Sequence, residues 1–511
     1  MSAHQPQTGD TTGTDTEQAA AGRATAEPAG SVSGSTPTVA RAALAVVAGR
    51  AAGALSRRLH RGGGTSLPGL VAQRIYPDVI AHLAAQLRHG AVVITGTNGK
   101  TTTSGMTAGA LRAAGRRVWR NREGANLLRG IAAALIIRAQ PSGRLRWDGD
   151  AAAVFEVDEA AFPAVVAVVR PRVVAVTNLF RDQLDRYGEV DTVAERWHTT
   201  LRDLPATTTL VLNADDPAVA ALAEGFAGHV LYYGVENTAQ DGGADSADGA
   251  GEVVDTRTCP RCGGVLAFAP RFYSHIGHWS CPDCGEARPA PAVAAREVRL
   301  ERLERACFTL VTPEGDARPI TISLPGLYNV YNALAAATIG QAMGAGVEAI
   351  VESLSHFSAA FGRAERIAAG DRTVQLLLAK NPTGLNEVLR ALAAVPGPLH
   401  LLLALNDRAA DGEDVSWIWD AEVERAAGFA AQVTVSGTRA FDLALRLKYA
   451  GIAPARVESD PAAALEAALV ATPPGETLYV VPTYTAMLAV RAELERRGHT
   501  PHYWEQRDAG A

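Results

Sequence analysis

The stretch that decides the fold runs from Val92 to Thr102 and has the sequence VVITGTNGKTT. Its first four residues are apolar and mostly β-branched, which is typical of a buried strand. A glycine-rich turn follows at once, and 103–114 then has the pattern of a helix. Glycines let such a turn curl so that backbone N–H groups converge on phosphate oxygens at a helix N-terminus. The order predicts a nucleotide-binding loop; an ordinary glycine-rich turn is the alternative.

Two side chains of this loop suit ATP with Mg²⁺. Lys100 supplies a mobile cation for the β- and γ-phosphates, and the Thr101 hydroxyl suits a Mg²⁺ position. The chain has few lysines, Lys100, Lys380 and Lys448, so a lysine kept in this motif indicates that a compact ammonium is needed there. The residues that we expect to bind ATP are Gly96, Thr97, Asn98, Gly99, Lys100, Thr101 and Thr102.

Short β-branched runs alternate with amphipathic segments on both sides of a long polar stretch. Strands are expected at 91–95, 152–157, 173–177, 209–213, 230–233, 307–311 and 320–324, and in a second block at 373–379, 399–405, 432–435 and 477–481. This alternation favours α/β architecture with parallel sheets covered by helices on both faces. We expect a central domain over 39–365 and a smaller Rossmann-like domain over 366–511.

The ends and the linking segments have simpler compositions. Residues 1–38 carry almost no large apolar side chains and are expected to be disordered, as is the polar loop 240–252. Residues 39–60 read as one helix, which either packs on the domain or lies on an anionic membrane surface at the inner face. No signal-peptide pattern and no apolar run of spanning length is apparent, so a cytoplasmic protein is expected.

Composition excludes some classes of function. The chain has 511 residues, 47% of them hydrophobic and 20% charged, as in globular proteins with several domains. Its net charge of −6 supplies no basic field, which disfavours nucleic acid as a partner.

Four cysteines form two CxxC pairs inside an insertion that we place at about 253–292. The four are Cys259, Cys262, Cys281 and Cys284. This spacing suits a closed tetrahedral structural Zn²⁺ site, and two redox pairs or disulfides are the alternative. The fifth, Cys307, lies in an apolar strand pattern and is expected in the core. A glutaminase of the Cys–His type needs a free nucleophilic thiol, so this chain is not expected to be one by itself.

The loop GTNGKTTT resembles the Mur-ligase superfamily, which joins carboxylates to amines through acyl phosphates. Further motifs follow in the family's order: FEVDE at 155–159, TNL at 177–179, DQLD at 182–185, LNADDP at 212–217, YNVYNA at 328–333 and GRAE at 362–365. The resemblance implies that Glu156 reaches the Mg²⁺ beside Thr101, and that Asn213, Asn332 and Arg363 contact the nucleotide.

The chain departs from ordinary Mur ligases in two respects. Gln183 stands where the family usually has histidine, and no lysine between Lys100 and Lys380 can serve as the family's carbamylated metal ligand. Whether a second Mg²⁺ binds therefore stays open. The nucleotide loop also arrives by residue 96, so the family's usual N-terminal substrate domain is expected to be missing.

With the cysteine insertion, KNPTG at 380–384 and the acidic loop 406–420 resemble the MurT family, the ligase subunits of lipid II isoglutaminyl synthases. This resemblance implies that ATP activates the α-carboxyl of D-glutamate in the lipid II stem peptide and that ammonia gives D-isoglutamine. It also implies a heterodimer with a GatD-type glutaminase whose triad is completed by Asp414, or by Asp411. The alternative is that both are solvated loop carboxylates.

We place the substrate carboxylate between the two domains, near Asn126, Lys380 and Asn381, with Asn121 and Arg122 as alternatives. Trp417 and Trp419 belong either to the core or to the partner interface. Two rival functions stay open: a stand-alone amino-acid ligase of the Mur or folylpolyglutamate type, and a non-catalytic nucleotide-binding module with a zinc ribbon.

Overall fold

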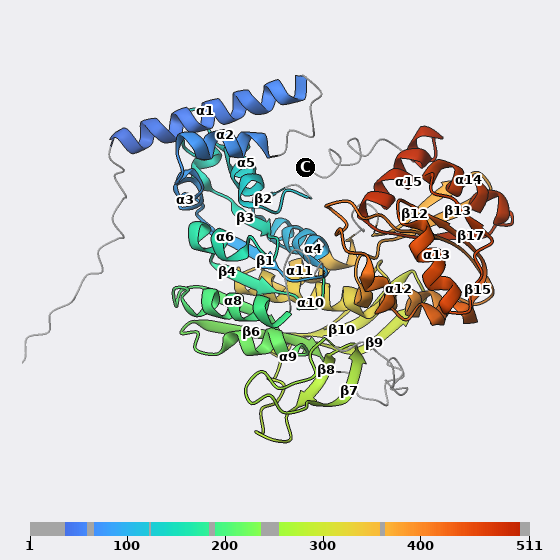
Figure 1. The fold of residues 1–511 in the computed structure, drawn as a ribbon. Helices are drawn as coiled ribbons and strands as arrows, with labels where there is room; N and C mark the ends of the chain where they lie inside the picture. Colours follow the sequence, from blue (N-terminus) through green and yellow to red (C-terminus); the bar gives the residue numbers. More distant parts are fainter. Residues whose placement is uncertain are drawn as a thin grey trace, which may run out of the picture.

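A computed structural model describes residues 36–58, 66–121, 124–182, 190–236, 255–357 and 363–500 (Figure 1). The predicted loop 240–252 lies outside these residues, and so does the predicted tail 1–38 up to residue 35. The described strands form two large sheets and one hairpin. The α/β class is therefore confirmed, with two sheets that are mainly parallel.

The first sheet has nine strands in the order β11-β10-β9-β6-β5-β4-β1-β3-β2. Their bounds are β1 Ala91–Thr95, β2 Val118–Arg120, β3 Ala152–Glu156, β4 Val173–Val176, β5 Thr209–Asn213, β6 His229–Val235, β9 Val293–Glu301, β10 Arg305–Val311 and β11 Ala317–Ile322. The strands from β2 to β9 run parallel, and β10 and β11 continue the edge antiparallel. The continuous apolar runs are central strands because both faces of a parallel sheet are buried.

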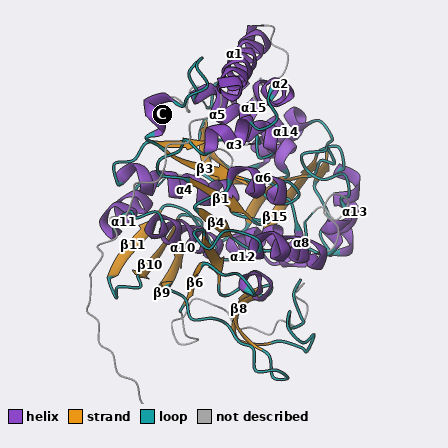
Figure 2. Cartoon of the chain, turned by 90° about the vertical axis from the view of Figure 1, so that its left-hand side faces the viewer, coloured by secondary structure: helices purple, strands orange, loops and turns teal. Residues whose placement is uncertain are grey.

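Helices cover both faces of this sheet (Figures 1 and 2). Their bounds are α1 Thr36–Arg58, α2 Leu67–Ile75, α3 Val79–Ala84, α4 Lys100–Ala113, α5 Leu128–Arg138, α6 Phe162–Val169, α8 Val190–Arg202, α9 Pro217–Ala220, α10 Leu327–Ala342 and α11 Val347–Ser355. One face packs on α4, α10 and α11, and the other on α3, α5, α6 and α8. Successive β1 residues alternate between these cores: Ile94 joins the first and Val93 the second.

The second sheet has six strands in the order β12-β13-β17-β14-β15-β16. Its elements are β12 Arg363–Ala369, β13 Arg372–Leu377, α12 Pro382–Ala393, β14 Leu399–Ala404, β15 Ala430–Ser436, α13 Ala440–Tyr449, β16 Arg456–Val457, α14 Pro461–Ala471, β17 Thr477–Pro482 and α15 Tyr484–Arg496. Only β12 is antiparallel to its neighbour. Leu401 faces the core under α12 and α13, whereas Leu402 faces α14 and α15.

Helix α1 differs from the expectation in one respect. The stretch Thr38–Ser56 is long and apolar enough, by length and composition alone, to cross a membrane, which corrects the expectation that no run reaches that length. One side of the helix nevertheless packs on the domain: Ala42, Ala45 and Val46 are buried. Gly49 and Gly53 allow close approach, since a Cβ at either would lie within 3 Å of Pro68 in α2.

The cysteine insertion lies between β6 and β9. It contains the hairpin of β7 Ala267–Tyr273 and β8 Ile276–Ser280, at the lower end in Figure 1. The Trp279 indole donates to Ala214 O at 2.9 Å, and Arg288 pairs with the buried Asp215, so the insertion is fixed against the sheet. Cys307 is only half buried beside Thr321, whereas its neighbours face the core; its expected place in the core is wrong because it points to the other side of β10.

Candidate active site

The nucleotide loop joins β1 to α4 at the carboxyl edge of the first sheet. Gly96 has φ +131° and Gly99 has φ +86°, a region that favours glycine. A Cβ at Gly99 would lie 2.0 Å from Asn332 Oδ1, and one at Gly96 would lie 2.2 Å from Thr177 Oγ1. The loop therefore requires glycine at both positions, for conformation and for space.

Lys100 is buried under the loop that it follows. Its Nζ donates to Gly96 O at 2.5 Å, to Thr97 O at 3.1 Å and to Glu159 Oε1 at 2.8 Å. Burial raises the pKa of Glu159, while the charges of Lys100 and Lys380 act in the opposite direction. A buried carboxylate is costly unless it is paired, so this ion pair holds the ammonium close to the loop.

Thr101 and Glu156 meet as the sequence predicts for a Mg²⁺ position. Thr101 Oγ1 donates to Glu156 Oε1 at 2.9 Å. Glu156 ends β3, where Asn121 brackets its backbone: Glu156 N donates to Asn121 Oδ1 at 3.0 Å, and Asn121 Nδ2 donates to Glu156 O at 2.8 Å. Asn121 therefore positions Glu156, and it does not line the cavity. A hydroxyl beside a carboxylate is the kind of hard oxygen pair that Mg²⁺ accepts.

The second sheet contributes two residues from the segment between β13 and α12. Asn381 caps α12, its Oδ1 accepting from Gly384 N at 2.8 Å, and its Nδ2 donates to Asn98 Oδ1 at 3.0 Å. Lys380 Nζ donates to Asp182 Oδ2 at 2.6 Å. Both contacts cross from one sheet unit to the other, so the loop that precedes α12 is joined to the nucleotide loop.

A cavity of about 400 Å³ lies where these groups meet. Its lining includes Lys100, Thr101, Glu156, Asn126, Asn381 and Tyr484. This is the size of a site for a small molecule or for part of a larger one. Charged and polar groups converge at the nucleotide loop, and side chains from both sheet units form the walls.

Other residues singled out from the sequence have different surroundings. Asn213 is buried, donates to Thr177 O at 3.3 Å and does not line the cavity, so its geometry is that of a turn residue. Asn332 lies beneath Gly99, lines the cavity and accepts from Thr103 Oγ1 at 3.3 Å. The side chains of Arg122, Gln183 and Arg363 lie outside the described residues.

Sequence reasoning missed the roles of Glu159 and Asp182. Both are acidic residues of quoted motifs, and each binds one of the two lysines near the cavity. Asp182 Oδ1 is also buried with no hydrogen-bond partner among the described residues. The signal was present, since three acidic residues stand within 156–159, but only the fold shows which of them faces Lys100.

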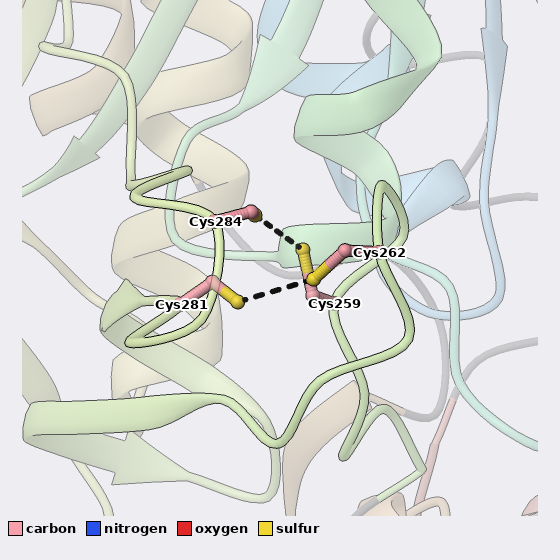
Figure 3. A group of neighbouring side chains, drawn as sticks. All are labelled: Cys259, Cys262, Cys281 and Cys284. Carbon is pink, nitrogen blue, oxygen red and sulfur yellow. Dashed lines mark hydrogen bonds between the residues drawn. The ribbon is translucent and has the colours of Figure 1, made fainter.

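The four predicted metal-ligating cysteines come together in two turns (Figure 3). Their Sγ atoms all lie within 4.8 Å of one another, with 3.7 Å between Cys259 and Cys284 and 3.5 Å between Cys262 and Cys281. Four thiolates about 2.3 Å from a tetrahedral Zn²⁺ would stand about 3.8 Å apart, so donor set and spacing fit this metal. All four are free thiols, which removes the disulfide alternative for this structure.

Asp411 and Asp414 lie in one loop but have opposite surroundings. Asp411 is buried and accepts from Thr485 N at 2.7 Å and from Thr485 Oγ1 at 2.5 Å. Asp414 is exposed and accepts from Ser416 N at 2.8 Å. The Ser416 backbone N–H lowers the pKa of Asp414. Asp411 therefore fixes the loop, and Asp414 is the carboxylate that faces outward.

Comparisons with known proteins agree with this arrangement. Residues 94–256 match the Mur ligase middle domain family, and residues 378–487 match the MurT ligase C-terminal family. Among solved structures, a pseudomurein peptide ligase type C from Methanothermus fervidus has a TM-score of 0.61 at 24% identity, covering 81% of this chain and 80% of that one. MurF from Acinetobacter baumannii has a TM-score of 0.60 at 19% identity, covering 83% and 80%. These structures show the Mur-ligase fold.

Two curated relatives are similar over nearly the whole chain. The MurT subunit of lipid II isoglutaminyl synthase (glutamine-hydrolyzing) from Streptococcus pneumoniae is 32% identical, covering 89% of this chain and 97% of that relative. The subunit of the same name from Staphylococcus aureus is 33% identical, with the same coverage. On this evidence the chain belongs to the MurT family of Mur-type ligase subunits.

Proposed function

We propose that this chain is the ligase subunit that amidates the α-carboxyl of D-glutamate in the lipid II stem peptide. The observation that carries the proposal is the convergence of Lys100 and the Thr101–Glu156 pair on a cavity walled by both sheet units. The two curated relatives are named for lipid II isoglutaminyl synthesis, which supports this choice of substrate.

The chemistry has two steps. A carboxylate oxygen attacks the γ-phosphorus of ATP, the bond to the β-phosphate oxygen breaks, and an acyl phosphate and ADP form. Ammonia then attacks the carbonyl carbon, inorganic phosphate leaves, and the amide remains after loss of a proton. A Mg²⁺ ion held by Thr101 and Glu156 would supply charge neutralisation on the phosphates.

Lys100 is prepared for the first step by its ion pair. Its ammonium is held by Glu159 and by two loop carbonyl oxygens. A bound γ-phosphate competes for the same donor, and Lys100 then stabilises the negative charge that spreads over the transferred group. Glu159 acts in this proposal as a positioning residue for Lys100.

The acceptor carboxylate is proposed to lie against Asn126, Lys380 and Asn381. All three line the cavity, and the last two come from the second sheet unit. An ammonium and two amides can hold a carboxylate with its oxygen toward the phosphate site, which replaces a bimolecular encounter by positioning.

Ammonia is proposed to come from a separate glutaminase subunit of the GatD type, with which the chain forms a heterodimer. Asp414 is the exposed carboxylate that could complete the partner's Cys–His pair. An apolar surface lies nearby: Phe441 and Tyr449 on α13 are each 73% exposed, and the Trp419 ring lies 5.5 Å from the Tyr449 ring. Exposed aromatic groups of this kind mark protein interfaces.

Zn²⁺ is proposed to be structural. Four protein ligands close the coordination sphere, so no position is left for a reacting water. The ion would fix the insertion that Trp279 and Arg288 attach to the first sheet.

We place the reaction on the cytoplasmic side of the membrane, where ATP is available. The test is amidation by the purified chain with its glutaminase partner, ATP, Mg²⁺ and lipid II. Product mass separates an amide from an added amino acid, and so separates the proposal from a stand-alone amino-acid ligase. Absence of ATP turnover with lipid II and either glutamine or ammonia would favour a non-catalytic nucleotide-binding module and overturn the proposal.

A further inference from the structure

Helix α1 is apolar on two opposite sides. One side packs on α2 and α5 through Ala42, Ala45, Val46 and the two glycines. The other side points away from the domain: Leu44 is 59% and Leu55 58% exposed, with Val39 and Val47 also exposed. We call Val39, Leu44, Val47 and Leu55 the outward face. Apolar side chains that gather on one exposed helix face mark an interaction site.

The segment that contains α1 is positively charged, whereas the chain as a whole is negatively charged. No acidic residue occurs between Glu27 and Asp78, whereas that segment contains six arginines: Arg41, Arg50, Arg57, Arg58, Arg61 and Arg74. The chain as a whole carries a net charge of −6. Arg41 and Arg58, near the two ends of α1, are exposed. A cationic, apolar helix on an acidic protein is complementary to an anionic, apolar surface.

Helix α1 is anchored to the domain along its packed side, which suits it to lie along a surface rather than to insert across one. Arg50 donates to Ala139 O at 3.0 Å, at the end of α5, and the packed side of α1 is removed from any lipid by the domain itself. Figure 1 shows α1 at the periphery, with its long axis across the top of the first sheet unit, and in Figure 2 α1 again lies at the top. Among the described elements, none lies beyond it in either view.

The helical layer below α1 leads directly to the cavity. Helix α5 begins at Leu128, and the segment before it contributes Gly124, Asn126 and Leu127 to the lining. One short layer of helices, α1, α2 and α5, therefore connects the outward face to the wall of the cavity.

We propose that the outward face of α1 docks on an anionic lipid bilayer and so presents the cavity to a lipid-linked substrate. This inference rests on the proposed function for the identity of the substrate, but the docking itself does not depend on it. Apolar side chains would enter the headgroup region, and the flanking arginines would meet lipid phosphates.

The test is flotation of the full-length chain, in complex with its partner, with phosphatidylglycerol vesicles and with phosphatidylcholine vesicles. The chain should float with the anionic vesicles, less so at high salt, and weakly with the neutral ones. Leu44→Glu combined with Val47→Glu should lower binding to anionic vesicles by about tenfold or more. Val470→Glu, which changes an exposed apolar residue on α14, is the matched control and should bind as the wild type does.

A second pair of variants tests how much the arginines contribute to vesicle binding. Arg41→Glu combined with Arg58→Glu should lower binding to anionic vesicles by about tenfold, whereas Arg196→Glu on the exposed side of α8 should leave it unchanged. Amidation of a lipid-free muropeptide checks that each variant is folded, and its rate should be unaffected.

Several outcomes would overturn the inference. One is equal vesicle binding by the wild type and the Leu44 and Val47 variant; another is equal binding to anionic and neutral vesicles. A third is a dimer of this chain that the same variant dissociates while vesicle binding persists, because α1 would then be covered by a second copy. If vesicles bind through α1 but lipid II is not amidated, the proposed function fails and the docking stands.

Discussion

The two parallel sheets end in different chemistry at their carboxyl edges. The first presents buried charges: Lys100 with Glu159, and Glu156 beside Thr101. The second presents amides and hydroxyls that hold its loops: Asn406 N donates to Thr483 Oγ1 at 3.0 Å, and its Oδ1 accepts from Thr438 N at 2.9 Å. Its buried carboxylate, Asp411, is held by the Thr485 backbone N–H and hydroxyl and not by a cation.

This difference separates two tasks. Buried charges are costly, so a fold that keeps them beside a cavity is prepared for a charged ligand that replaces water. The hydrogen bonds that Asn406 and Asp411 make to backbone N–H groups and hydroxyls instead hold a loop in one conformation. The first edge therefore suits phosphoryl transfer, and the second suits positioning of the acceptor and of the loop that carries Asp414.

The largest effect is expected from removing the cation of the first edge. Lys100→Ala should lower ATP-dependent amidation with ammonia by about a thousandfold or more, because the transferred phosphoryl group loses its fixed positive charge. Initial rates measure this effect. Lys448→Ala, at an exposed position on α13, is the matched control and should retain activity. Substantial activity in the Lys100 variant would show that the first edge does not perform the transfer.

The loop of the second edge should control only the supply of ammonia. Asp414→Asn should lower glutamine-supported amidation by about a hundredfold, because a triad loses its orienting carboxylate. The rate with added ammonium should stay at the wild-type level. Asp411→Asn should instead destabilise the loop, since Asp411 binds Thr485. An equal loss with glutamine and with ammonium in the Asp414 variant would contradict this assignment.

Zinc should matter for stability rather than for chemistry. Cys281→Ser, or removal of the metal by a chelator, should lower the Tm by roughly 5–10 °C through loss of the closed site. Thermal unfolding and metal analysis measure the two quantities. Cys307→Ser should retain the metal, because Cys307 lies outside the cluster. A variant that loses zinc yet unfolds at the wild-type temperature would contradict a scaffold role.

The smallest effect is expected from changing Glu159, the carboxylate that pairs with Lys100. Glu159→Gln should lower the KM for ATP by about threefold, since a phosphate no longer competes with a carboxylate for Lys100. Because burial raises the pKa of Glu159, protonation as the pH falls should mimic the variant, and the difference between the two proteins should shrink. ATP kinetics across pH test this; a difference that grows toward low pH would have the wrong sign.

Much of the first sheet could be predicted from the sequence because its strands are continuous apolar runs. The expected strands 91–95 and 209–213 have the same bounds as β1 and β5. Strand β9 was missed because VAAREVRLE alternates apolar with charged residues and lies at the antiparallel edge, where one face is solvated. Strand β2 is only three residues long.

The residues of the candidate site also differ in how far the sequence predicts them. The nucleotide loop and the cysteine cluster are local in sequence, so spacing alone predicted them, and the structure brings each set together. The pairs Lys100–Glu159 and Lys380–Asp182 join segments that are distant in sequence, the first pair within one sheet unit and the second between the two, so only the folded structure reveals them. The catalytic roles of these residues stay predictions.

The Asn381 side chain joins the two sheet units mechanically. The same primary amide caps the N-terminus of α12 by accepting from Gly384 N, and it contacts Asn98 of the nucleotide loop. Any rotation that separates the two units must break this contact inside the cavity. A ligand that fills the cavity therefore touches both sides of this joint, so its binding and the angle between the units should be coupled.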